Sequence, residues 1–116
     1  LRPRVALVKQ HRAGQFIGDS SWAKSSAKAW AKRTAPTLKG ARRVVCNGYT
    51  AGTRANNAFT RKLARARALE MCLLLKRYGM KAPFTLSARG NVNPVASNRV
   101  ERGRILNRRV ELSVYR

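Results

Sequence analysis

The spacing of apolar and polar residues predicts two amphipathic helices. Between residues 22 and 34, small and apolar side chains recur at helical spacing with lysines on another face, and Pro36 and Gly40 end the segment. Good helix formers dominate residues 58–78 until Gly79 supplies the stop. An apolar stripe typical of a face packed on a sheet runs along this second helix, and it consists of Ala64, Ala68, Met71, Cys72 and Leu75.

Shorter apolar segments predict strands. The β-branched run that ends at Gly48 places Val44 and Cys46 on one face, which indicates a central strand. Residues 1–12 fit either an edge strand or a basic arm, and residues 90–104 fit a polar loop with room for one helical turn. Strands are expected at residues 15–17, 42–48, 83–88 and 109–115.

This order, β-α-β-α-β-β, predicts an α/β (α+β) two-layer sandwich. Strands that alternate with helices imply parallel crossovers, and a final hairpin-like pair would add an antiparallel strand. We therefore expect one mixed sheet with the two main helices on one face. At 116 residues the chain fits a single domain spanning 1–116, because two cores would each bury too little surface.

The charge adds information about partners. Lys and Arg number 26 against four Asp and Glu, which gives a formal net charge of +22. Repulsion among so many positive charges destabilises the compact state of the protein. A chain that carries this charge is therefore expected to bind polyanions. The candidates are nucleic acid, anionic lipid headgroups and acidic wall polymers, and charge alone does not choose among them.

Several kinds of chemistry lack the residues they need. One histidine and two cysteines without a CxxC motif are too few for a metal site, and four scattered carboxylates argue against hydrolytic catalysis. We therefore expect a protein that is not an enzyme and needs no cofactor. The longest apolar run, residues 71–75, is far shorter than a membrane helix requires. Since residue 1 is Leu and no signal-like stretch follows, we expect a processed or excised piece of a longer chain.

Both cysteines and both tryptophans fall on predicted core faces. Cys46 and Cys72 can pack as two small buried hydrophobes, or form a disulfide between strand and helix in an oxidising compartment. Trp22 and Trp30 fit the core of the first helix better than they fit stacking platforms for a ligand.

The turn Gly48-Tyr49-Thr50, the helix segment 63–75 and the ending 103–112 each match a motif of one known family. Together they resemble the OmpA-like peptidoglycan-binding domains, whose members anchor proteins noncovalently to the bacterial cell wall. Gly48-Tyr49-Thr50 resembles the family's Gly-His/Tyr-Thr-Asp turn, and residues 63–75 resemble its Leu-Ser-x-x-Arg-Ala helix. Residues 103–112 match the Gly-Arg-x-x-Asn-Arg-Arg-Val-Glu-Ile ending, which is the most specific of the three. The resemblance covers about residues 16 to 115. It implies a module of the bacterial envelope or of a secreted protein.

The resemblance also implies a binding site for the peptidoglycan stem peptide. In the family, an Asp in the first turn holds the amine of diaminopimelate, and Arg side chains hold its carboxylates. Here Ala51 replaces that Asp after Thr50, and Thr60 stands where the family usually has Asn. Arg67 and Arg108 keep an anion clamp, and Asn107 matches a further ligand contact.

Other interpretations remain open for these residues. Arg67 could instead pair with Glu70 or Glu101, and Arg109 fits a structural role on the alternate face of its strand better than a ligand contact. Without the site Asp, a peptidoglycan stem would be bound weakly or in altered form. The alternative function is an electrostatic binder of nucleic acid, anionic membrane or wall polymer on the same fold.

Overall fold

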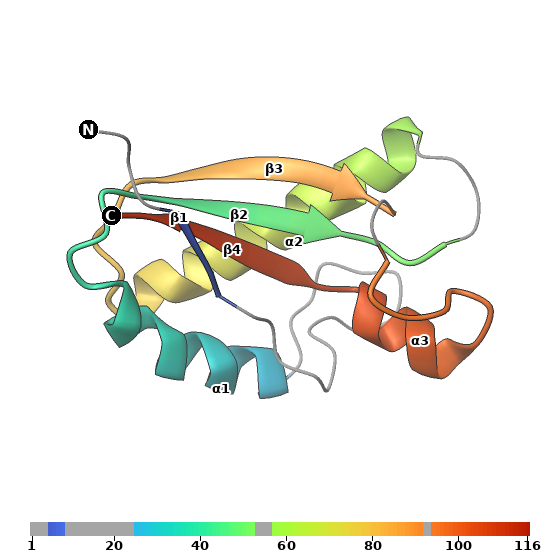
Figure 1. The fold of residues 1–116 in the computed structure, drawn as a ribbon, viewed down its shortest axis with the longest axis horizontal. Helices are drawn as coiled ribbons and strands as arrows, with labels where there is room; N and C mark the ends of the chain where they lie inside the picture. The colour runs from blue at the N-terminus through green and yellow to red at the C-terminus, as the bar shows by residue number, and fades with distance from the viewer. Residues whose placement is uncertain (1–4, 9–24, 53–56, 92–93) are drawn as a thin grey trace.

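A four-stranded mixed sheet forms one layer of the molecule. The computed structural model describes residues 5–8, 25–52, 57–91 and 94–116 (Figure 1). The strands stand in the order β1-β4-β2-β3; β2 is parallel to β3, and β4 is antiparallel to both β1 and β2. Their bounds are β1 Val5–Val8, β2 Arg43–Tyr49, β3 Phe84–Gly90 and β4 Val110–Tyr115.

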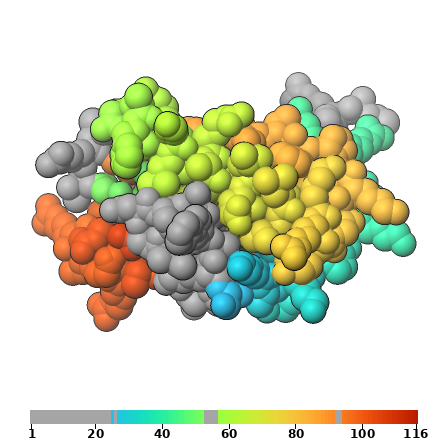
Figure 2. Space-filling model, turned by 180° about the vertical axis from the view of Figure 1, so that it is seen from behind, coloured from blue at the N-terminus to red at the C-terminus, as the bar shows by residue number. Residues whose placement is uncertain are grey.

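The second layer consists of helices on one face of the sheet. The long helix α2 (Ala58–Arg77) packs on β2 and β3, and α1 (Ser25–Thr34) lies beside it, followed by the short 3-10 helix η1 (Ala35–Leu38) (Figures 1 and 2). The predicted two-layer architecture with a mixed sheet is confirmed. Val5–Val8 forms an edge strand on β4, whereas the predictions for residues 15–17 and for Trp22 lie outside the described residues.

The core lies where the sequence pattern predicts it. All five residues of the predicted α2 stripe are fully buried, as are Val44 and Cys46 on β2. A disulfide joins Cys46 to Cys72, with the Cα atoms 6.3 Å apart, so the strand and the helix are linked covalently through the core. Trp30 is buried in the same core.

Close contact between β2 and α2 requires a glycine. A Cβ at Gly48 would overlap the backbone carbonyl of Ala64, so only glycine lets the helix approach the strand at this point. The helix begins at a capping box in which Asn57 and Thr60 each bond the other's backbone N–H. It ends before Gly79, whose φ of 107° closes the last turn as expected.

One expectation about the C-terminal third is wrong. The last two strands form no hairpin-like pair, because β3 and β4 lie on opposite sides of β2. A long connection therefore crosses from one side of β2 to the other. Part of it forms a third helix, α3 (Glu101–Asn107), which begins within the loop where one helical turn is expected and extends three residues beyond it. Gly103 lets α3 pack closely on the preceding loop, because a Cβ there would overlap the backbone of Ser97.

Candidate functional site

The carboxyl end of β2 is held between its two neighbouring strands. The Tyr49 backbone N–H donates to the carbonyl of Arg109, at 2.8 Å, and the Thr50 N–H donates to the carbonyl of Gly90, at 2.7 Å. The first bond continues the β4 pairing and the second continues the β3 pairing. Thr50 is therefore fixed at the point where three segments meet.

Thr50 and Arg108 lie at the same end of the β2–β4 pair. The antiparallel pairing runs from Arg43 opposite Tyr115 to Gly48 opposite Val110, and the bond from Tyr49 N–H to the Arg109 carbonyl continues it by one residue. Both side chains are buried, with exposed fractions of 3% and 9%. These two predicted site residues, 58 positions apart in sequence, therefore belong to one end of the sheet.

An unusual feature of this pair is its unsatisfied polar atoms. Among the described residues, two buried side-chain nitrogen or oxygen atoms have no hydrogen-bond partner, and they are Thr50 Oγ1 and Arg108 Nε. Buried polar groups in folded proteins are nearly always paired, and an unpaired one calls for an explanation. Because both atoms are enclosed in this structure, a ligand would supply the missing partner only if the segments that cover them move apart.

The other side of the Arg108 guanidinium already binds a carboxylate. Its Nη1 donates to Glu101 Oε1 at 2.7 Å, and Arg104 Nε lies 3.6 Å from the same carboxylate. The hydrogen bond from Arg108 is the main cause that holds the pKa of Glu101 below its usual value. Glu101 is therefore the carboxylate partner of Arg108 within the chain.

Arg67 reaches the same end of β2 from the helix layer. Its guanidinium Nη1 donates to the carbonyl of Tyr49, at 3.2 Å. The side chain is fully buried, so it is not an exposed clamp. Arg67 thus contacts Tyr49 at the end of β2, whereas the guanidinium of Arg108 contacts Glu101 of α3. That both guanidinium groups serve one ligand stays a prediction.

Asn107 uses its side chain to hold the loop before α3. Its Oδ1 accepts from the backbone N–H groups of Val95 and Ala96, at 2.8 and 3.2 Å. Its Nδ2 donates to the Ala96 carbonyl and to Asn98 Oδ1. Asn98 in turn donates to the carbonyl of Gly52, at 2.8 Å, in the loop after β2. With every polar group engaged and no exposed surface, Asn107 positions the site in this structure.

The remaining predicted residues have simpler surroundings. Thr60 is part of the capping box of α2, where its hydroxyl accepts from the Asn57 N–H at 2.9 Å. Ala51 directly follows Thr50, is half-buried, and offers only a methyl group. Position 51 therefore supplies no carboxylate for an amine.

Arg109 has the structural role that its position on the strand predicted. It lies over the ring of Tyr49, 3.8 Å from the ring centroid, and its Nε donates to Glu111 at 2.8 Å. Burial and the nearby Glu111 raise the pKa of the Tyr49 phenol. This cluster fixes the side of Tyr49 that faces away from α2.

Sequence reasoning missed two residues that organise the site. Glu101 was considered as a partner of Arg67, but its bond to Arg108 was not expected. The available signal was its rarity, because it is the one acid between residues 71 and 110. The role of Asn98 could not be predicted, because nothing in the sequence of a polar loop indicates which amide side chain will hydrogen-bond another segment. In the described ranges, no group of three or more metal-binding side chains occurs, and no helix is long and apolar enough to cross a membrane.

Solved structures match this arrangement closely. The chain is 27% identical to the cell wall anchor of the T6SS from Pseudomonas aeruginosa, with a TM-score of 0.69 over 98% of this chain and 82% of that one. The chain has the OmpA-like fold. It also matches the periplasmic domain of Helicobacter pylori MotB at 21% identity and TM-score 0.75, covering 98% of this chain and 74% of that one.

A third match extends the same fold to another organism. A MotB-like protein from Desulfovibrio vulgaris is 18% identical with a TM-score of 0.69, over 97% of this chain and 76% of that one. A scan against protein-family models found no match, and neither did a search of curated proteins. The likeness is therefore carried by structure more than by sequence.

Proposed function

We propose that this chain is a noncovalent peptidoglycan-binding module that works outside the cytoplasm and has no catalytic role. In this proposal, a stem-peptide carboxylate is held by Thr50 and Arg108 at their end of the β2–β4 pair. The observation that carries it is the pair of buried atoms without partners, Thr50 Oγ1 and Arg108 Nε. The neighbours support it, since one is a cell wall anchor and another is a periplasmic domain.

The energetics favour an acidic ligand at this point. A buried donor without a partner costs about 1–3 kcal/mol, and a carboxylate that accepts from Arg108 Nε would recover this cost. The Thr50 hydroxyl can donate to the same ligand. Arg67 supports the site from the buried side with a second positive charge, while Asn107 and Thr60 hold the surrounding loop and helix end. Ala51 leaves binding to depend on the anionic half of the ligand.

Two substitutions test the unpaired atoms directly. Thr50→Val removes the hydroxyl at nearly constant shape, so we expect unchanged or slightly higher stability together with about tenfold weaker retention on purified peptidoglycan. Arg108→Lys keeps the charge but removes Nε, and we expect a similar loss of binding. Arg102→Lys, on the exposed side of α3, is the matched control and should bind like the parent.

Restoring the missing carboxylate tests the other half of the site. Ala51→Asp should strengthen binding to a diaminopimelate-containing stem peptide by about ten to a hundredfold, because a charge-assisted contact is added. Binding is measured by co-sedimentation with purified peptidoglycan in rising salt. If the parent does not sediment with peptidoglycan even at low salt, the proposal is rejected.

A second candidate function rests on the net charge of +22. A chain this basic can bind nucleic acid, anionic membrane or wall polymers by counterion release, without a specific pocket. In that case DNA would outcompete wall fragments, and Thr50→Val and Arg108→Lys would both bind like the parent. The salt dependence would then report the number of charges involved.

A further inference from the structure

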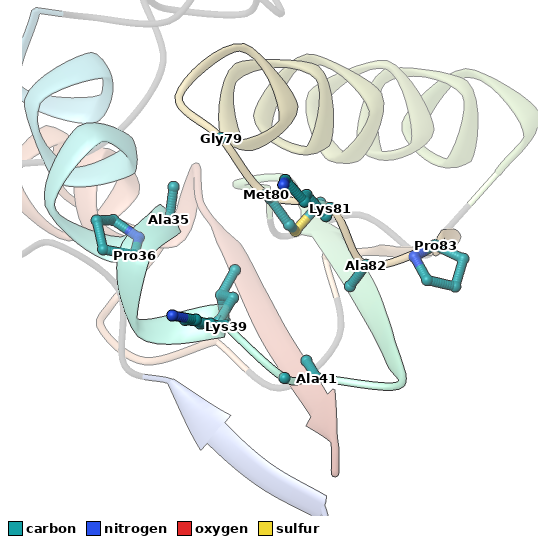
Figure 3. A pocket seen from close by; sticks show the side chains of 11 residues that line it. Ala35, Pro36, Lys39, Ala41, Gly79, Met80, Lys81, Ala82 and Pro83 are labelled. Carbon is teal, nitrogen blue, oxygen red and sulfur yellow. The ribbon is translucent and has the colours of Figure 1, made fainter.

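A cavity of about 410 Å³ lies between the end of η1 and the turn that follows α2 (Figure 3). One wall comes from residues 35–41 and the other from residues 79–83. Both walls lead into the amino ends of strands, β2 and β3, whereas Thr50 follows the carboxyl end of β2. The cavity is therefore separate from the candidate wall-binding site, and what it binds does not depend on the proposed function.

The floor of the cavity is apolar. Ala35, Leu38, Met80 and Ala82 line it, and each is at most 7% exposed. In the described part of the chain, the two buried side-chain polar atoms without a partner are Thr50 Oγ1 and Arg108 Nε, and neither lines the cavity. The side chains that line the cavity therefore have no unsatisfied polar atom that a trapped water could bond. The volume falls in the range of about 300–1,000 Å³ that is typical of small-molecule sites.

The rim of the cavity is positively charged. Lys39 and Lys81 are both exposed and stand on opposite walls, as Figure 3 shows. The guanidinium of Arg116 lies behind the first wall, where it donates to the carbonyls of Lys39 and Thr37 at 3.2 and 2.7 Å. None of the residues that line the cavity is acidic.

An apolar floor below a cationic rim selects one class of ligand. We propose that the cavity binds the acyl chain of a single-chain amphiphile whose anionic headgroup lies between Lys39 and Lys81. The chain removes apolar surface from water, which is the larger contribution to affinity. The two lysines supply orientation and selectivity for a negative head, because exposed ion pairs contribute modestly.

The test uses alkyl probes below their micelle-forming concentration, with binding to the intact chain followed by calorimetry. Decyl phosphate is expected to bind with a one-to-one stoichiometry and about tenfold more tightly than octyl phosphate, because two more methylenes are buried. Decanoate tests a carboxylate head on the same chain length, and decyl maltoside tests a neutral head. Both anionic probes should bind more tightly than the neutral one.

Variants separate this site from the general positive charge. Lys39→Gln combined with Lys81→Gln should weaken decyl phosphate binding about fivefold and leave decyl maltoside unaffected. Lys62→Gln with Arg65→Gln, on the exposed face of α2, removes the same charge elsewhere and should have no such effect. Ala41→Trp should fill the cavity and abolish binding of both, with peptidoglycan retention unchanged.

Three results would overturn the proposal. They are affinity that does not depend on chain length, equal weakening by the two charge-removing double variants, and parent-like binding by a folded Ala41→Trp variant. The lysine variants change only exposed side chains, so they remain informative even if the tryptophan variant does not fold. If the parent chain binds the amphiphiles but is not retained on peptidoglycan, the proposed wall-binding function is wrong and the proposal for the cavity stands.

Discussion

Removal of the disulfide between Cys46 and Cys72 is expected to lower the free energy of unfolding by about 3.5 kcal/mol. The two cysteines are 26 positions apart. The chain-entropy relation assigns about 12 cal/mol/K to closing a loop of that size, which gives this value at 25 °C. For a chain of 116 residues, with an unfolding entropy of about 2.1 cal/mol/K per residue, the melting temperature should fall by about 14 °C.

Thermal unfolding followed by circular dichroism measures this difference. Because both cysteines are fully buried, the protein is reduced in denaturant and refolded under reducing conditions before melting. The double variant Cys46→Ala, Cys72→Ala should melt at a similarly lowered temperature, and a reductant should not change it further. A reduced parent that melts within about 2 °C of the oxidised parent would show that the disulfide does not stabilise the fold in this way.

Three further predictions concern packing, loop structure and pH. Gly48→Ala should lower the free energy of unfolding by about 3 kcal/mol, because the new Cβ overlaps the Ala64 backbone; urea titration measures it. Asn107→Ala should cost about 2–4 kcal/mol through lost bonds to the loop, with hydrogen exchange increasing at Val95 and Ala96. Glu101 has a lowered pKa, so its contribution to stability is present above the unfolded pKa and is lost as pH falls through the folded one. Urea titrations from pH 6 to pH 3 should therefore show a smaller loss of stability for Glu101→Gln than for the parent.

The main elements could be predicted because their patterns are local. The α2 stripe repeats at helical spacing over several turns, and a run such as Val44 to Cys46 shows its buried face by simple alternation. Neither inference needs any knowledge of distant contacts. The motif at residues 103–112 added the identity of the fold, which periodicity alone would have left open among other mixed-sheet sandwiches.

Strand order and side-chain pairing could not be predicted, because they depend on long-range contacts. β4 could join the sheet beside β3 or on the far side of β2, and the packing of the segment between β3 and β4 decides which. This segment contains α3, which makes it compact. The family resemblance placed Thr50 and Arg108 in one ligand site, but no sequence signal indicated their hydrogen bonding. Only the structure reveals that each has a buried side-chain atom without a partner.

The pairing of β1 with β4 has a mechanical consequence. Val5 lies opposite Tyr115, so β1 begins and β4 ends at the end of the sheet that is far from Thr50 (Figure 1). Tension between a ligand held at one end of the strands and a tether attached at the other end would run parallel to the strands. Such a load shears all the ladder bonds of β4 together instead of opening them one at a time, which is the geometry in which a small sheet resists force best.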